Sequence, residues 1–158
     1  MTAPADAVRL ARRFAAPPAD VWRAWTDPAD VRRWFGSDPL GTVRAARLDV
    51  RPGGSFEVAF ADRDGTEHTC RGEYLEVVPA ARLAFTWRWQ SEPGVETRVR
   101  VALAADGAGT RMDFEHAHLG AASRHDYARG WQSTFDKLER LLAPPESRAP
   151  QAGSITGS

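Results

Sequence analysis

The C-terminal part of the chain carries one long amphipathic stripe, and this stripe limits what the whole chain can fold into. Apolar side chains recur there at spacings of three and four residues, the period of one helix face: Tyr127, Trp131, Phe135, Leu138 and Leu142. We predict one continuous helix over residues 123–142, with Ser123 as N-cap and Asp126 as its capping-box partner. A lone helix of this kind must bury its stripe against the apolar face of a sheet.

The rest of the chain alternates apolar and polar residues, as strands with one buried face do. The first such segment, residues 8–14, precedes two short helices that begin at Pro17-Pro18 and at Asp27-Pro28. Six further strands follow between turn sequences: residues 43–50, 56–60, 67–78, 83–90, 95–103 and 112–118. Successive hairpins form a curved antiparallel sheet with one apolar face. The predicted fold class is therefore α+β, a curved sheet wrapped around a long C-terminal helix.

Composition narrows the class of protein. The 158 residues suit one domain, which we place at residues 7–142, with residues 1–6 and 143–158 as flexible tails. The 21 basic and 21 acidic residues balance, which argues against nucleic-acid binding through clustered positive charge. No apolar run is long enough for a membrane span and no signal peptide is visible, so a cytoplasmic protein is expected. Because all but one of the basic residues are arginine, we infer a GC-rich, bacterial genome.

The aromatic residues allow two interpretations. The chain has six Trp and seven Phe residues but only two Tyr. Their rings could fill a core, or could line a cavity where the sheet and the helix separate. Gly130, beside Trp131, either lets the helix approach the sheet or leaves room for a ligand. The predicted lining consists of inward-facing residues: Arg12, Trp22, Trp25, Trp34, Phe35, Phe56, Val58, Phe60, Phe85, Trp87, Trp89, Phe114, His116, Tyr127 and Trp131.

His116 and His118 are two residues apart on a predicted strand, so both should point to one face. They could form a polar or acid–base group at the cavity mouth, or a surface pair at the end of the strand. A zinc ion would need further ligands in fixed geometry, and the sequence nominates none. The single Cys70 excludes a multi-cysteine site and an internal disulfide. We therefore predict neither a metal nor another cofactor.

Arg12 lies on the apolar face of the first strand and needs an anionic partner, because an unpaired buried charge is costly. Asp49, near the end of the next strand, is the favoured partner. The alternative is that Arg12 anchors a carboxylate or carbonyl of a ligand. Asp49 could instead cap the turn at Gly53-Gly54.

Several motifs resemble one known superfamily. They lie at residues 16–28, 33–35, 49–54, 72–79, 83–87 and 109–116, and at Gly130-Trp131. In this order they resemble the START-like, SRPBCC superfamily, which has the helix-grip fold. Within it the chain is most similar to the homologues of the activator of the heat-shock-chaperone ATPase, the AHSA type. The resemblance covers residues 7–142.

The resemblance implies a fold more directly than a function, since this architecture supports binding proteins, carriers and enzymes. Our first hypothesis is that a small hydrophobic or aromatic molecule binds between helix and sheet. The second is a cyclase- or hydrolase-like enzyme in the same cavity, with His116 or His118 as general base. The third is a domain that binds a protein partner, as a chaperone cofactor or a homodimer does.

Overall fold

The computed structural model describes residues 7–118 and 126–144. Within them the chain runs through one strand, two helices, six strands and one helix, as predicted. The elements are β1 (Ala7–Phe14), α1 (Pro18–Thr26), α2 (Pro28–Trp34), β2 (Thr42–Leu48), β3 (Ser55–Ala61), β4 (Glu67–Val78), β5 (Arg82–Trp89), β6 (Thr97–Asp106), β7 (Gly109–Ala117) and α3 (Tyr127–Leu142).

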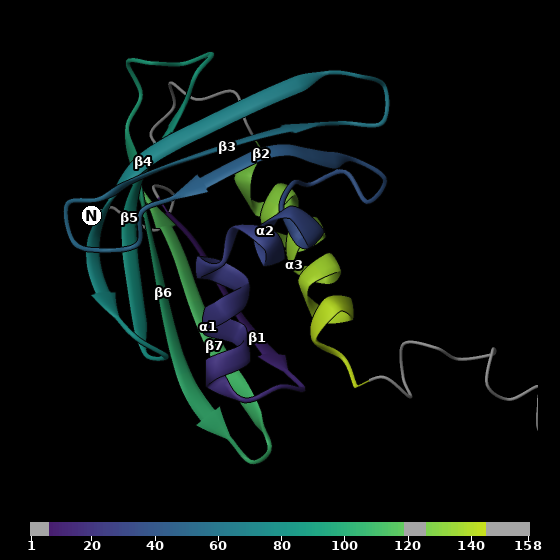
Figure 1. Ribbon diagram of the computed structural model, residues 1–158, viewed down its shortest axis with the longest axis vertical. Coiled ribbons are helices and arrows are strands. Elements are labelled where there is room, and N and C mark those ends of the chain that lie inside the picture. Colours follow the sequence, from purple (N-terminus) through teal and green to yellow (C-terminus); the bar gives the residue numbers. More distant parts are fainter. Residues whose placement is uncertain (1–6, 119–125, 145–158) are drawn as a thin grey trace, which may run out of the picture.

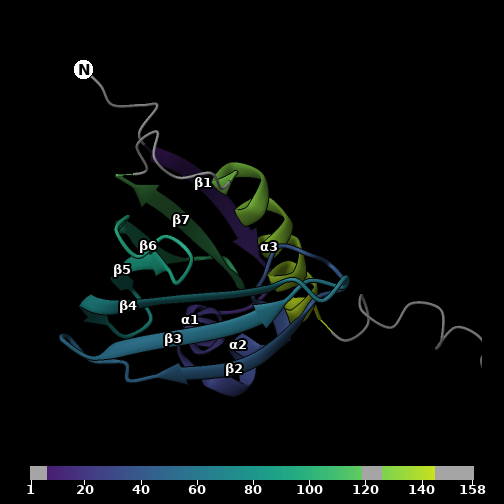
Figure 2. The same cartoon turned by 90° about the horizontal axis from the view of Figure 1, so that it is seen from above.

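The seven strands form one antiparallel sheet in the order β1-β7-β6-β5-β4-β3-β2. Neighbours in the chain are neighbours in the sheet, except that β1 pairs with the last strand, β7, in a register that joins Ala7 to Ala117. The sheet bends around the helices (Figures 1 and 2), so its concave face encloses the core. The predicted helix-grip α+β fold is confirmed.

Alternation along the strands decides which side chains face the helices. In β6, Thr97, Val99 and Val101 are buried, whereas Arg98 and Arg100 between them are exposed. This period of two places the large apolar side chains of the strand on the concave face. The charged residues therefore lie on the convex face.

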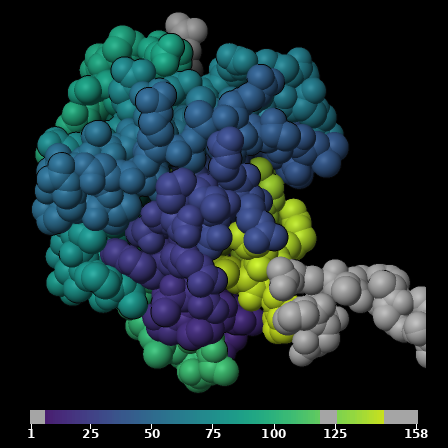
Figure 3. All heavy atoms as spheres, viewed as in Figure 1, coloured from purple at the N-terminus to yellow at the C-terminus, as the bar shows by residue number. Residues whose placement is uncertain are grey.

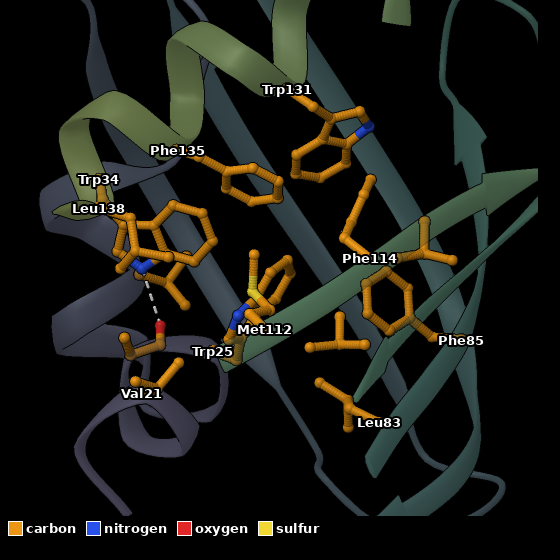
Figure 4. Close-up of a cluster of buried hydrophobic side chains, with 14 of the residues drawn as sticks. Val21, Trp25, Trp34, Leu83, Phe85, Met112, Phe114, Trp131, Phe135 and Leu138 are labelled. Carbon is orange, nitrogen blue, oxygen red and sulfur yellow. Dashed lines mark hydrogen bonds between the residues drawn. The ribbon is translucent and has the colours of Figure 1, made fainter. Parts of the chain in front are cut away.

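Helices α1 and α2 meet at a capped junction. The Asp27 side chain accepts a hydrogen bond from the backbone nitrogen of Ala29 at 2.9 Å, and Pro28 occupies the first turn of α2. The indole Nε1 of Trp34 donates to the carbonyl oxygen of Ala24 at 2.8 Å, which is the dashed line in Figure 4. This buried hydrogen bond fixes α2 against α1.

Helix α3 packs its apolar stripe onto the concave face, as predicted. Trp131, Phe135 and Leu138 point from the helix into the core (Figure 4), and Trp131 is only 5% exposed. The opposite side of α3, coloured yellow, lies at the surface beside α1 and α2 (Figure 3). No helix in the described ranges is both long and apolar enough to cross a membrane.

The predicted start of this helix needs correction. Asp126 is itself the N-cap, since its side chain accepts a hydrogen bond from the backbone nitrogen of Arg129 at 3.1 Å. Asp126 therefore lies one position before the helix, not at the third residue inside it. Ser123, the cap predicted from the sequence, lies outside the described residues.

The predicted pairing of Arg12 with Asp49 was wrong. Arg12 bonds to three residues of α3: Asp136 at 2.8 Å, Glu139 at 3.1 Å and the carbonyl oxygen of Gln132 at 3.1 Å. Asp49 instead pairs with the neighbouring Arg51. The reason is topological, because β1 and β2 are consecutive in the chain but lie at opposite edges of the sheet.

We predict that Arg12→Met lowers the unfolding free energy by about 1–2 kcal/mol. The variant loses charge-assisted hydrogen bonds to α3, but the two carboxylates it leaves behind keep access to water. Arg13→Met is a matched control on the same strand, because the Arg13–Asp106 pair is about half exposed on both sides. We expect about 0.5 kcal/mol or less for this control. Urea denaturation measures both, and equal losses would contradict a special role for Arg12.

Candidate functional site

A cavity of about 370 Å³ lies between the N-terminal half of α3 and strands β3, β4 and β5. Six aromatic rings form most of its wall: Phe35, Phe60, Trp87, Trp89, Tyr127 and Trp131. The remaining lining residues are small or polar and come mainly from α3 and from the loop after α2: Gly36, Ser37, His68, Asp126, Arg129, Gly130, Ser133 and Thr134. The site is therefore an apolar pocket with a polar margin.

The structure separates the predicted lining into groups. The six aromatic residues above, all of them in the predicted lining, line the cavity. A second group surrounds a separate void of only about 20 Å³: Trp25, Trp34, Phe56, Val58 and Phe85. A void of this size holds about one water, so these five residues belong to packed core.

The other predicted lining residues contact neither space. Phe114 packs against Trp131, with ring centroids 4.6 Å apart, and His116 lies under the same indole. Trp22 packs at the edge of the core, and Arg12 binds the C-terminal half of α3. The alternation of apolar and polar residues predicts correctly which face of the sheet each side chain occupies. It does not predict where along the curved sheet that side chain lies.

Gly130 keeps the helix wall of the cavity open. A Cβ atom built at Gly130 would meet only the Cβ of Ser37, at 3.8 Å, which is ordinary van der Waals contact. Both residues line the cavity, so a larger side chain at position 130 would project along its wall. Of the two interpretations of Gly130, the geometry favours room beside the helix.

The loop that follows α2 forms another wall and is bound to α3 at two points. The hydroxyl of Ser133 donates to the carbonyl oxygen of Ser37 at 2.5 Å. The ammonium group of Lys137 donates to the carbonyl oxygens of Asp38 at 3.0 Å and Phe35 at 3.4 Å. Burial lowers the pKa of this lysine, the only one in the chain. The wall residues 35–37 are thus fixed relative to the helix.

His116 is the centre of a buried hydrogen-bond chain. Nε1 of Trp131 donates to Nδ1 of His116 at 3.0 Å, so the remaining proton of the neutral ring is on Nε2. That Nε2 donates to the hydroxyl of Thr97 at 2.7 Å, and the hydroxyl donates to the carbonyl oxygen of Trp87 at 3.2 Å. Burial lowers the pKa of His116 to about 3. Neither ring nitrogen has a free lone pair, which argues against His116 as a general base.

The expectation that His116 and His118 share one face was wrong. Strand β7 ends at Ala117, and His118 adopts a positive φ of 64° and is exposed, whereas His116 is fully buried. The turn of the backbone after the strand breaks the two-residue period. In the described part of the chain, no three His, Cys, Asp or Glu side chains gather as a metal ligand set.

Sequence reasoning missed His68 as a lining residue. The register pairs His68 with Phe60 across β3 and β4, and this pairing brings its ring to the cavity. One signal was available, since His68 shares a strand face with the buried Cys70. The hairpin register needed to place it beside Phe60 cannot be read from the pattern alone.

We predict that His116 makes folding stability depend on pH. The unfolded chain protonates this histidine near its ordinary pKa of 6.5, but the folded protein does so only near 3. Between these values the unfolded state binds the extra proton, so stability falls as the pH falls, by about 1.4 kcal/mol per pH unit. His116→Gln should remove this part of the slope, because an amide can accept from Trp131 and donate to Thr97 without titrating. Denaturation curves from pH 7 to pH 4.5 test this, and parallel slopes would contradict it.

Solved structures with the same fold are widespread. Protein CV1439 from Chromobacterium violaceum is 27% identical, with a TM-score of 0.79, and the match covers 88% of this chain and 99% of that one. A protein from Rhizobium leguminosarum is 30% identical, with a TM-score of 0.71 and coverage of 86% and 93%. DynU16, described as a protein of the dynemicin biosynthetic locus, is 28% identical, with a TM-score of 0.70 and coverage of 88% and 48%.

A search of functionally curated proteins gives no match. The model of one protein family, described as "Activator of Hsp90 ATPase homolog 1-like protein", matches residues 15–143. This range includes all the elements from α1 to α3 and every residue that lines the cavity. The resemblance found in the sequence is thereby confirmed, and the chain belongs to the family of Activator of Hsp90 ATPase homolog 1-like proteins.

Proposed function

We propose that the protein binds a small aromatic molecule in the cavity between α3 and strands β3–β5. The observation that carries this proposal is the cavity itself, about 370 Å³ in volume and walled by six aromatic rings. Cavities that bind small molecules begin at about 300 Å³ and combine apolar walls with a few polar groups. The space is open to solvent on one side, so a ligand can enter it.

The surface gives less support to a partner protein. Among the described residues, only Leu40 and Leu75 are large hydrophobic side chains that are exposed. Protein-binding surfaces typically have contiguous apolar patches of several hundred Å². The similar protein DynU16 is described as belonging to the dynemicin biosynthetic locus, and this setting supports a small-molecule ligand.

Filling the cavity from Gly130 should weaken binding. The probe is N-phenyl-1-naphthylamine, a neutral aromatic compound whose emission increases in apolar surroundings. We expect Gly130→Leu to weaken its binding at least about tenfold, because the new side chain occupies ligand space. Fluorescence titration measures the dissociation constant, and circular dichroism verifies the fold.

Gly130→Ala is the matched control. It adds one methyl group at ordinary contact distance from Ser37, so binding should stay within about threefold of wild type. Replacing a helical glycine by alanine should also raise stability by about 0.5–1 kcal/mol. Equal probe affinity in Gly130→Leu and wild type, or no binding to either, would refute the proposed cavity function.

A further inference from the structure

His68 stands out on the cavity wall because it is a titratable ring within an aromatic surface. Its ring lies 5.3 Å from Phe60 and 6.0 Å from Trp89, centroid to centroid, and both neighbours also line the cavity. About 27% of its side chain is exposed. The group is therefore partly shielded from water and within reach of a bound molecule.

Asp62 determines which nitrogen of His68 is left for a ligand. Oδ2 of Asp62 lies 2.9 Å from Nε2 of His68. A carboxylate only accepts hydrogen bonds, so Nε2 carries the proton and the lone pair of the neutral ring is on Nδ1. In the described part of the chain, His68 has no other hydrogen bond or ion pair. A carboxylate behind an imidazole fixes the tautomer and the orientation of the ring.

Several of the other polar groups of the wall are already engaged. The hydroxyls of Ser133 and Thr134 donate to the carbonyl oxygens of Ser37 and Gly130. Asp126 caps α3, and its second carboxylate oxygen lies 3.7 Å from Nε of Arg129. The Arg129 side chain is 86% exposed, so an anion bound there would remain in water and gain little.

We propose that Nδ1 of His68 accepts a hydrogen bond from the hydroxyl group of a bound aromatic ligand, so that the cavity selects phenols. This inference rests on the proposed function, since it concerns a ligand of the same cavity. A phenol matches the site in two respects: its ring packs against the aromatic wall, and its hydroxyl donates to the unused acceptor.

Three related probes separate the hydroxyl from the ring: 2-naphthol, 2-methoxynaphthalene and naphthalene. Burial of apolar area alone would favour the methyl ether or the hydrocarbon over the naphthol. We expect wild-type protein to bind 2-naphthol about tenfold more tightly than 2-methoxynaphthalene in calorimetric titrations, the gain typical of one well-placed hydrogen bond. Naphthalene has no added methyl group and controls for a steric penalty on the ether.

His68→Phe is the matched variant, because it keeps a ring against Phe60 and Trp89 and removes the acceptor. We expect it to bind the ether as wild type does but to lose the preference for 2-naphthol. Asp62→Asn should reduce the preference as well, since its amide can donate to Nε2 and move the proton to Nδ1.

The outcomes distinguish this inference from the function on which it rests. If no probe binds, the proposed function fails. If all three bind but wild type and His68→Phe show the same preference, the cavity function stands and the role of His68 is refuted. Tighter binding of 2-naphthoate than of 2-naphthol, lost in Arg129→Gln, would also overturn it by assigning the polar contact to Arg129.

Discussion

The hydrogen bond from the Trp131 indole to Nδ1 of His116 connects α3 to the middle of the sheet. Through Thr97 the same chain of donors and acceptors continues to the backbone of β5, so one helix and three strands share it. Every donor in this hydrogen-bond chain has an acceptor. For this reason His116 can be fully buried without a large cost in folding free energy. The position of the Trp131 ring, and with it one wall of the cavity, depends on this network.

The two halves of α3 contribute differently to the molecule. Towards its C-terminus, Phe135 and Leu138 are fully buried among the side chains of α1, α2 and the sheet, and neither lines the cavity. Towards its N-terminus, Gly130 leaves space beside the helix, and Ser133 is bound to the carbonyl oxygen of Ser37 in the loop after α2. Stability and binding capacity are thus assigned to separate turns of one helix.

The sequence predicted the fold well because each element depends on local pattern. Alternation placed Val99 and Val101 inward, and the stripe of Trp131 and Phe135 located the long helix. The candidate site was predicted less completely, because it depends on distances along the sheet that no period encodes. Trp25 and Trp87 both face inward, yet only Trp87 lines the cavity. The partner of Arg12 could not be found either, since the closure of the sheet by β1 and β7 is a non-local event.

The pairing of β1 with β7 also affects the order in which the strands and helices can fold. During synthesis, β1 leaves the ribosome first but has no strand to pair with until β7 has been made, because the register joins Ala7 to Ala117. The hairpins from β2 to β7 can assemble earlier, each from residues close in the chain. Pairings between distant segments are slow to form, since the entropy of closing a long loop is lost before the contacts are gained. We therefore expect β1 to join a partly assembled sheet late, and α3, made last of all, to complete the core over it.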